Sequence, residues 1–412
     1  SGGVELDLLR QPVVNVAPQI QDILDRALEG DTIGQEDIIR LFQARDGDAT
    51  AVMAAGDQLR AKAVGETVSY VINRNINYTN VCSHSCQFCA FSKGRGSNSM
   101  RGKPYDLTLE EIVRRTVEAR SRGASEVCLQ GGIHPDYTGK TYLAILKAIK
   151  KADPDMHVHA FSPLEVFTGA KSLNISVRDF LVELKEAGLG SMPGTAAEIL
   201  VDEVRQAICA DKLTVDEWLM VIETAHDIGL PTTATIMFGH LEGYSDWASH
   251  LLKIKALQIK TGGFTEFVPL PFVAHEAPLF KQGKSRQGPS LRETILMHSI
   301  ARLVLHPHIT NIQASWTKMG PEAIELSLRS GVNDLGGSLM NESISRAAGS
   351  EYGQERSRQD LISMATSVGR PARQRSTVYG DAIWSLPLDQ HQPALSPMIL
   401  PAAGKRSNII VS

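Results

Sequence analysis

Residues 68–89 read VSYVINRNINYTNVCSHSCQFC, and this stretch decides the fold. Its first part places the apolar residues Val68, Tyr70 and Ile72 at every second position, which is the period of a half-buried strand. Three cysteines follow within a single run of eight residues, at positions 82, 86 and 89. The stretch therefore predicts a β-strand that leads directly into a cysteine-rich loop.

Beyond this loop, strand-like and helix-like segments alternate along the chain. Helix starts are marked by Thr108, Thr214 and Ser290, each followed three residues later by a glutamate in the capping-box pattern. The further apolar runs lie at 126–130, 157–161, 189–192, 232–238, 264–268, 312–315 and 333–335. About eight βα units over roughly 270 residues predict an α/β fold, a (β/α)8 TIM-type barrel. A doubly wound open sheet is the alternative.

Helical extensions are expected at both ends of the barrel. Apolar residues at helical spacing precede Gly30, and a further helix is indicated around 358–366, before a basic run at 370–375. We expect both extensions to cap or flank the mouth of the barrel. The predicted parts are a helical N-terminal extension (1–62), the barrel (63–340), a C-terminal extension (341–385) and a proline-containing tail (386–412).

Composition limits the class of protein. Lys plus Arg number 42 and Asp plus Glu number 46, so the net charge is −4, and no strongly basic surface for nucleic acid is expected. No uncharged apolar run approaches the roughly 18 residues of a membrane span. The start Ser1-Gly2-Gly3 lacks the features of a secretory signal, and the cysteines are poorly spaced for disulfides. We expect a cytoplasmic protein, or one of an organelle stroma if the source is eukaryotic.

The cysteine spacing predicts a metal centre. Thiolates at Cys82, Cys86 and Cys89 can reach one site from a short loop, and iron with sulfide prefers such ligands. If only these three bind, a 4Fe–4S cluster keeps one iron open for a small molecule. The alternative is a structural zinc site that adds His84, but the loop is short and no second cysteine pair of this kind follows. Two more cysteines, Cys128 and Cys209, are expected to be buried as small apolar residues.

This CxxxCxxC spacing, with the aromatic Phe88 before the last cysteine, resembles the signature of the radical S-adenosylmethionine (SAM) superfamily. The resemblance implies that Cys82, Cys86 and Cys89 hold a 4Fe–4S cluster and that the open iron binds SAM. An electron from the reduced cluster would then split SAM into methionine and a deoxyadenosyl radical.

The same resemblance implies further contacts with SAM at the ends of strands. Phe88 and Met237 would lie against the adenine. Gly131 and Gly132 would receive the methionyl amino group, and Ser162 and Glu165 would hold the ribose hydroxyls. Each position also has a plain structural interpretation: loop packing for the aromatic ring, a strand-to-helix turn for the glycines, core filling for the methionine. The positions are Phe88, Gly131, Gly132, Ser162, Glu165 and Met237.

Two further residues are candidates for catalysis. His240 follows the predicted strand at 232–238, and Asp334 lies near the beginning of the one at 333–335. Catalytic residues of barrels gather at the carboxyl ends of the strands. A histidine in such a loop is more often simply hydrogen-bonded within the fold. The residues that contact the substrates are not indicated by the sequence.

Three stretches narrow the resemblance to the CofH family of FO synthase components: 75–82, 190–200 and 235–240. This resemblance implies a transferase that joins L-tyrosine to 5-amino-6-(D-ribitylamino)uracil, with a reducing electron donor and a CofG-type subunit as functional partners. The alternatives are an aminofutalosine synthase or a related radical SAM enzyme of menaquinone synthesis. A more distant alternative is a zinc-stabilised binding protein without catalytic activity.

Overall fold

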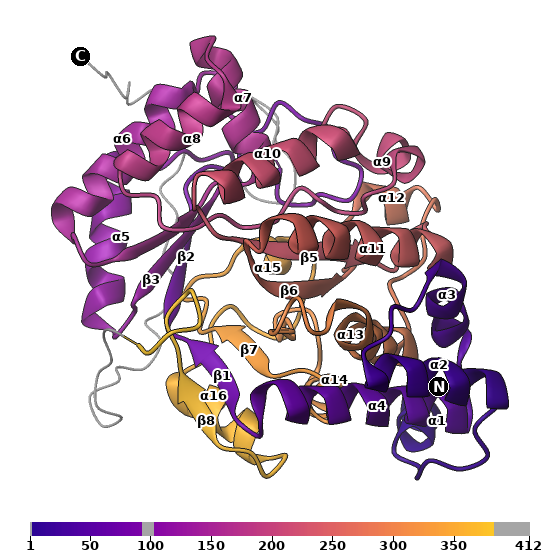
Figure 1. The fold of residues 1–412 in the computed structure, drawn as a ribbon. Coiled ribbons are helices and arrows are strands. Elements are labelled where there is room, and N and C mark those ends of the chain that lie inside the picture. Colours follow the sequence, from indigo (N-terminus) through magenta and orange to yellow (C-terminus); the bar gives the residue numbers. More distant parts are fainter. Residues whose placement is uncertain (1, 93–102, 383–412) are drawn as a thin grey trace.

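Parallel strands lie inside a ring of helices in the structure, a computed structural model that describes residues 2–92 and 103–382 (Figure 1). All pairings between the named strands are parallel. The strands are β1 (Val68–Val71), β2 (Asn73–Asn77), β3 (Glu126–Gln130), β4 (His157–Ala160), β5 (Thr232–Phe238), β6 (Phe264–Pro271), β7 (Asp334–Gly337) and β8 (Ala372–Gln374).

The strands close into a barrel. β1 pairs with β7, and β2, which continues β1 after Ile72, pairs with β3, which in turn pairs with β4. Residues 191–192 bridge β4 to β5, which pairs with β6, and residues 312–313 bridge β6 to β7. These pairings return to the starting strand, so the predicted α/β barrel is confirmed and the open sheet is excluded. Each predicted strand position lies in this circuit.

The helices after β2 surround the strands, and the three helices whose starts the sequence predicted begin at those positions. Thr214 and Ser290 form the expected capping boxes, and Thr108 accepts the expected hydrogen bond from the Glu111 amide. The helices are α5 (Leu109–Ser121), α6 (Gly139–Ala152), α7 (Pro163–Leu173), α8 (Val177–Glu186), α9 (Asp202–Cys209), α10 (Val215–Asp227), α11 (Tyr244–Thr261), α12 (Pro278–Lys281), α13 (Leu291–Leu305), α14 (Pro321–Leu328), α15 (Ile344–Ala347) and α16 (Arg358–Thr366).

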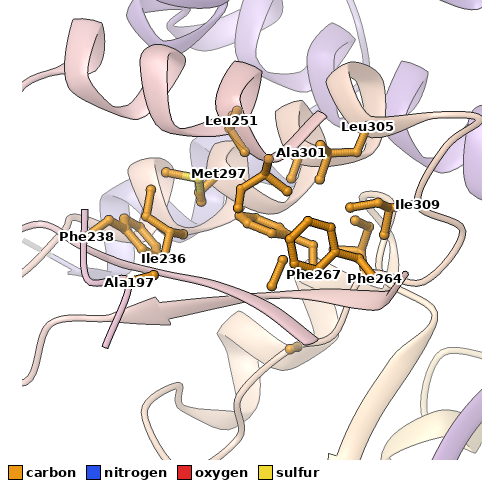
Figure 2. Packing of buried hydrophobic residues seen from close by; sticks show 14 of the residues in the cluster. Ala197, Ile236, Phe238, Leu251, Phe264, Phe267, Met297, Ala301, Leu305 and Ile309 are labelled. Carbon is orange, nitrogen blue, oxygen red and sulfur yellow. The ribbon is translucent and has the colours of Figure 1, made fainter. Parts of the chain in front are cut away.

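The hydrophobic core lies between the strands and the helical ring. Figure 2 shows this layer where Ile236 and Phe238 of β5 and Phe267 of β6 meet Met297 and Leu305 of α13. All five side chains are buried. Burying one such side chain contributes about 1.5–3 kcal/mol, so the outer face of the strands supplies the main stabilisation. The inner face of the barrel is then available for other uses.

The N-terminal helices brace the outside of the ring. They are α1 (Gly2–Leu9), α2 (Pro18–Glu29), α3 (Gln35–Gln43) and α4 (Asp46–Val64). The predicted helix stop is present, since Gly30 has a φ of 96° at the C-cap of α2. α4 lies along α13, and α3 lies against α11 (Figure 1). We expected these helices to cap or flank the mouth of the barrel. They pack on the outside of the ring, where the Gln35 side chain at the start of α3 donates to Ser245 Oγ in the first turn of α11, on the side of the carboxyl ends of the strands.

The chain after β7 returns to the opposite end of the barrel. β8 pairs with β1, and the residues after it cross the amino ends of the strands. Arg375 bonds Asp334 at the start of β7, with distances of 2.5 and 2.8 Å, and the Thr377 hydroxyl donates to Glu126 Oε2 at the start of β3, at 2.6 Å. Residues 372–379, called the floor segment below, therefore close this end.

The predicted tail at 386–412 lies outside the described residues. No helix in the described ranges combines the length and the apolar character that crossing a bilayer requires.

Candidate functional site

A cavity of about 410 Å³ lies inside the barrel. Barrel interiors are commonly filled by layers of branched apolar side chains. Here most of the side chains at alternate strand positions are polar or small, and together they line a chamber. They are Asn73, Asn75 and Asn77 of β2, Glu126, Cys128 and Gln130 of β3, Thr233, Thr235 and Met237 of β5, and Glu266, Val268 and Leu270 of β6.

The cysteine loop lies at the carboxyl ends of the strands, and Cys82, Cys86 and Cys89 all line the cavity. Hydrogen bonds to distant segments hold the loop in place. The Gln87 amide donates to the Ile208 carbonyl at 2.8 Å, and the Gln87 carbonyl accepts from the Leu279 amide at 2.7 Å. Helices α9 and α12 therefore fix the backbone between the last two cysteines.

The surroundings of the sulfur atoms suit an iron–sulfur cluster. The Ile133 amide donates to Cys82 Sγ and the Ser92 amide donates to Cys89 Sγ, each at 3.3 Å. Amide donors of this kind stabilise the thiolates that hold iron–sulfur clusters. Burial raises the pKa of Cys86 to about 12, so iron binding at this thiol has to displace its proton. The three thiols thus fit the ligand set predicted for the cluster.

His84 lies beside the cysteines but does not line the cavity. Burial opposes the ionisation of Cys82, yet hydrogen bonds from His84 and from the Ile133 amide leave the Cys82 pKa below its usual value. Across the described part of the chain, no three His, Cys, Asp or Glu side chains are placed to hold a single metal ion. The thiolates of a 4Fe–4S cluster differ from such ligands because each binds a different iron.

The two glycines after β3 allow the cysteine loop to approach this strand. A Cβ atom on Gly132 would lie 2.3 Å from the Val81 carbonyl oxygen and 2.9 Å from Cys82 Cβ. A Cβ atom on Gly131 would lie 2.4 Å from the ring of Tyr78. Both glycines line the cavity. A side chain at Gly132 would therefore displace the loop that carries the first cysteine, and one at Gly131 would displace the Tyr78 ring.

Ser162 and Glu165 form the capping box at the start of α7, and both line the cavity. The Ser162 amide donates to Glu165 Oε2 at 2.7 Å, and the Gly131 amide donates to Oε1 at 3.3 Å. The Tyr78 hydroxyl also donates to Oε1. Burial raises the pKa of Glu165. This carboxyl group thus joins the ends of β2, β3 and β4 beside the cavity.

Lys212 and Glu198 belong to the site and were not predicted from the sequence. Lys212 Nζ lies 3.0 Å from Glu198 Oε1 and 5.0 Å from the centroid of the Phe88 ring, and all three residues line the cavity. Burial lowers the pKa of Lys212, but Glu198 and the neighbouring thiols raise it above the usual value. A buried ammonium group is therefore held next to the cysteine loop. No local motif marks Lys212, which follows α9.

The predicted catalytic candidates lie away from the cavity. His240 is fully buried, with Nδ1 at 2.8 Å from Glu242 Oε2 and Nε2 at 3.2 Å from the Met237 carbonyl oxygen. Asp334 is bound by Arg375. Neither His240 nor Asp334 lines the cavity, whereas Met237 does. Cys128 also lines it, so this cysteine is not simply the buried apolar residue that we expected.

The polar lining of the chamber was also missed. The signal in the sequence was the alternation within the strands, where Asn73, Asn75 and Asn77 occupy every second position of β2. Alternate residues of a strand point to the same face. Polar residues at this period in a strand buried on both faces therefore indicate a polar lumen.

Comparison with family models matches two regions of the chain. Residues 76–254 match the radical SAM superfamily, and residues 261–380 match the CofH/MqnC C-terminal region. Among solved structures, methylornithine synthase (PylB) has a TM-score of 0.66 at 18% identity, covering 85% of this chain and 97% of that one. The hydrogenase maturase HydG from Carboxydothermus hydrogenoformans has a TM-score of 0.67 at 16% identity, covering 88% and 80%. These two likenesses establish the fold.

Curated relatives are much closer in sequence. The 5-amino-6-(D-ribitylamino)uracil--L-tyrosine 4-hydroxyphenyl transferase of Methanopyrus kandleri is 47% identical over 332 residues, which are 81% of this chain and 89% of that protein. The FO synthase of Streptomyces coelicolor is 48% identical over 345 residues, which are 84% of this chain but 39% of that protein. Radical SAM proteins use a 4Fe–4S cluster and SAM, which agrees with the cysteine loop. The chain therefore belongs to the radical SAM superfamily, in the family with the CofH-type C-terminal region.

Proposed function

We propose that this protein is a radical SAM transferase that joins the 4-hydroxybenzyl group of L-tyrosine to 5-amino-6-(D-ribitylamino)uracil, a step in the synthesis of the deazaflavin FO. The main support is the 47% identity with the Methanopyrus kandleri transferase over 89% of its length. The structure adds a cysteine loop that lines the cavity inside the barrel. The products are the joined compound, 2-iminoacetate, deoxyadenosine and methionine.

The cysteine loop and its neighbours hold the cofactors in this proposal. Cys82, Cys86 and Cys89 would hold a 4Fe–4S cluster, which would supply the electron for cleavage of SAM and so the means to take hydrogen from the tyrosine amino group. The Lys212 ammonium group attracts the carboxylate of SAM. Gly131 and Gly132, which have no side chains, allow the methionyl end to approach the backbone.

The remaining predicted residues hold the nucleoside part of SAM. Ser162 and Glu165 offer hydroxyl and carboxyl oxygens to the ribose. Phe88 and Met237 provide apolar surfaces for the adenine ring. The lumen encloses the reactants and excludes water and oxygen, which would quench radical intermediates. The Cα–Cβ bond of tyrosine would break to release 2-iminoacetate, and the hydroxybenzyl group would add to the uracil ring in the cavity. The one electron that the adduct must lose would return to the oxidised cluster.

A second component completes FO in our proposal. The chain spans 39% of the length of the Streptomyces coelicolor FO synthase, so that protein contains a large part that this chain does not match. We assign the closing of the deazaflavin ring to a CofG-type subunit that receives the joined compound. A reducing electron donor is also required, and we place the enzyme in the cytoplasm.

Product analysis tests this function. The protein is reconstituted with iron and sulfide without oxygen and given dithionite, SAM, tyrosine and the ribityl uracil. We expect deoxyadenosine and the joined compound by mass spectrometry, and neither from Cys86→Ala. Deoxyadenosine formed only with a futalosine-type precursor would show that the activity belongs to menaquinone synthesis instead.

A further inference from the structure

The cavity extends away from the cysteines to the amino ends of the strands. Residues at this end come from strands and from the floor segment. Asn73 and Asn77 are four residues apart on β2 and both line the cavity, so the lining spans about 13 Å along the strands. The far end of the chamber is thus a separate part of the site. It is lined by Asn73, Glu126, Glu266, Gln313, Arg375 and Thr377.

Carboxyl groups dominate this end. Among the described residues that line this end, Arg375 is the one cation, and it is bound to Asp334 through two hydrogen bonds of 2.5 and 2.8 Å. Its Nη2 lies 3.5 Å from Glu266 Oε2. Burial raises the pKa of Glu266 to about 7, with Asp334 acting in the same direction and Arg375 opposing it. A carboxylate or phosphate placed here would meet Glu126 and Glu266 and would be repelled.

Hydrogen-bonding capacity remains at this end. Arg375 and the Tyr379 hydroxyl both donate to Oε2 of Glu266. The side-chain amide of Gln313 makes no hydrogen bond to any other described residue, although Gln313 lines the cavity. Polar groups in a protein interior are normally paired. A free carboxyl oxygen and a free amide therefore fit a ligand that both donates and accepts hydrogen bonds.

We propose that the D-ribityl chain of the uracil substrate binds at this end, with its hydroxyl groups on Glu266 and Gln313 and its ring toward the cysteine loop. This inference rests on the function proposed above. The ribityl chain is uncharged, and each hydroxyl both donates and accepts, as this lining requires. The charged carboxylate of tyrosine is excluded from the same place. The floor segment then contributes to the recognition of the acceptor.

Equilibrium binding tests the inference without turnover. Titration calorimetry measures the binding of the ribityl uracil, of 5,6-diaminouracil and of tyrosine to the SAM-loaded holoenzyme, without reductant. Wild type should bind the ribityl compound more tightly than diaminouracil. Glu266→Gln and Gln313→Leu should each weaken binding of the ribityl compound about tenfold, as the loss of one hydrogen bond does, and leave diaminouracil unchanged. Gln313→Asn should weaken it less than Gln313→Leu.

Asn75→Ala is the matched control, because it removes a lumen amide one layer closer to the mouth. It should change the binding of both uracils by the same factor. Unchanged binding of the ribityl compound in folded Glu266→Gln and Gln313→Leu would overturn the inference. Weaker binding of tyrosine alone would also overturn it and would place the phenol at the floor. If the protein binds the ribityl uracil tightly and in preference to diaminouracil but forms no joined product, the proposed function is contradicted while the assignment of this subsite is retained.

Discussion

Single residues at the site were predictable where a chemical signature is local. Cys82, Cys86 and Cys89 lie within one short run, so their spacing alone indicated a cluster. Lys212 follows Glu198 by fourteen positions, and the cation lies at the site only because the chain folds back after α9. The roles of such residues depend on distances that the order of residues does not contain.

Gly132→Ala tests the close approach of the cysteine loop to β3. The new Cβ atom would lie 2.3 Å from the Val81 carbonyl oxygen, so the loop has to shift. We expect the iron content after reconstitution to fall by more than half, with little change in the thermal midpoint of unfolding. Gly243→Ala is the matched control, since its Cβ would meet nothing closer than 3.9 Å and should retain full iron. Equal iron content in both variants would show that the loop tolerates the displacement.

Glu242→Gln tests whether the buried Glu242 carboxyl group beside the site is ionised. Burial opposes its ionisation, but His240, the Gly239 amide and Trp247 lower its pKa to about 2 from the model-peptide value of 4.5. This stabilisation, about 3 kcal/mol, is fully present above pH 4.5 and is lost as the pH falls through 2. In urea unfolding, the deficit of Glu242→Gln relative to wild type should therefore shrink between pH 5 and pH 3. A deficit that is independent of pH would contradict the assigned ionisation. Glu110→Gln, at an exposed glutamate, serves as the control.

At the scale of elements, periodicity and caps predicted most of the barrel. The alternation of residues in β1 and the capping boxes of α10 and α13 are local patterns, and the structure contains these elements. The floor segment was missed because its basic run, 370–375, resembles a solvated surface. Its partners Asp334 and Glu266 lie 41 and 109 residues away from Arg375, so only the closed barrel brings them together.

Arg375→Met tests the floor segment as a structural element. The change leaves Asp334 buried with no guanidinium partner, which typically costs about 3–5 kcal/mol. Arg373→Met removes an exposed ion pair with Asp381 from the same floor segment and should cost at most about 1 kcal/mol. Free energies of unfolding in urea compare the two variants. Similar losses would mean that the floor segment is attached only loosely to the barrel.

At the scale of the whole molecule, a stable outer core surrounds a polar lumen. The packed layer between strands and helices carries the stability, and the chamber carries the chemistry. Eight strand positions and their helices were enough to predict the closed barrel, because each βα unit follows the same local rules. The polar lumen and the bracing by the N-terminal helices were not predicted, because both depend on how separate units meet.

The separation of core and chamber has a testable consequence. The three thiols line the cavity and are not members of the buried core cluster, although Cys82 and Cys86 pack against it. Cys82→Ala, Cys86→Ala and Cys89→Ala should each abolish deoxyadenosine formation while the far-ultraviolet circular dichroism and the thermal midpoint of the cluster-free protein stay close to wild type. Loss of the folded spectrum would show that the loop is needed to complete the barrel.

Electron paramagnetic resonance of the dithionite-reduced, reconstituted protein, recorded without and with SAM, tests the cluster assignment most directly. We expect the signal of a reduced 4Fe–4S cluster whose g values shift when SAM is added, because one iron has no cysteine ligand. The signal should be absent from Cys86→Ala. A cluster signal that is indifferent to SAM, or protein that binds no iron, would contradict the assignment of this chain as a radical SAM enzyme.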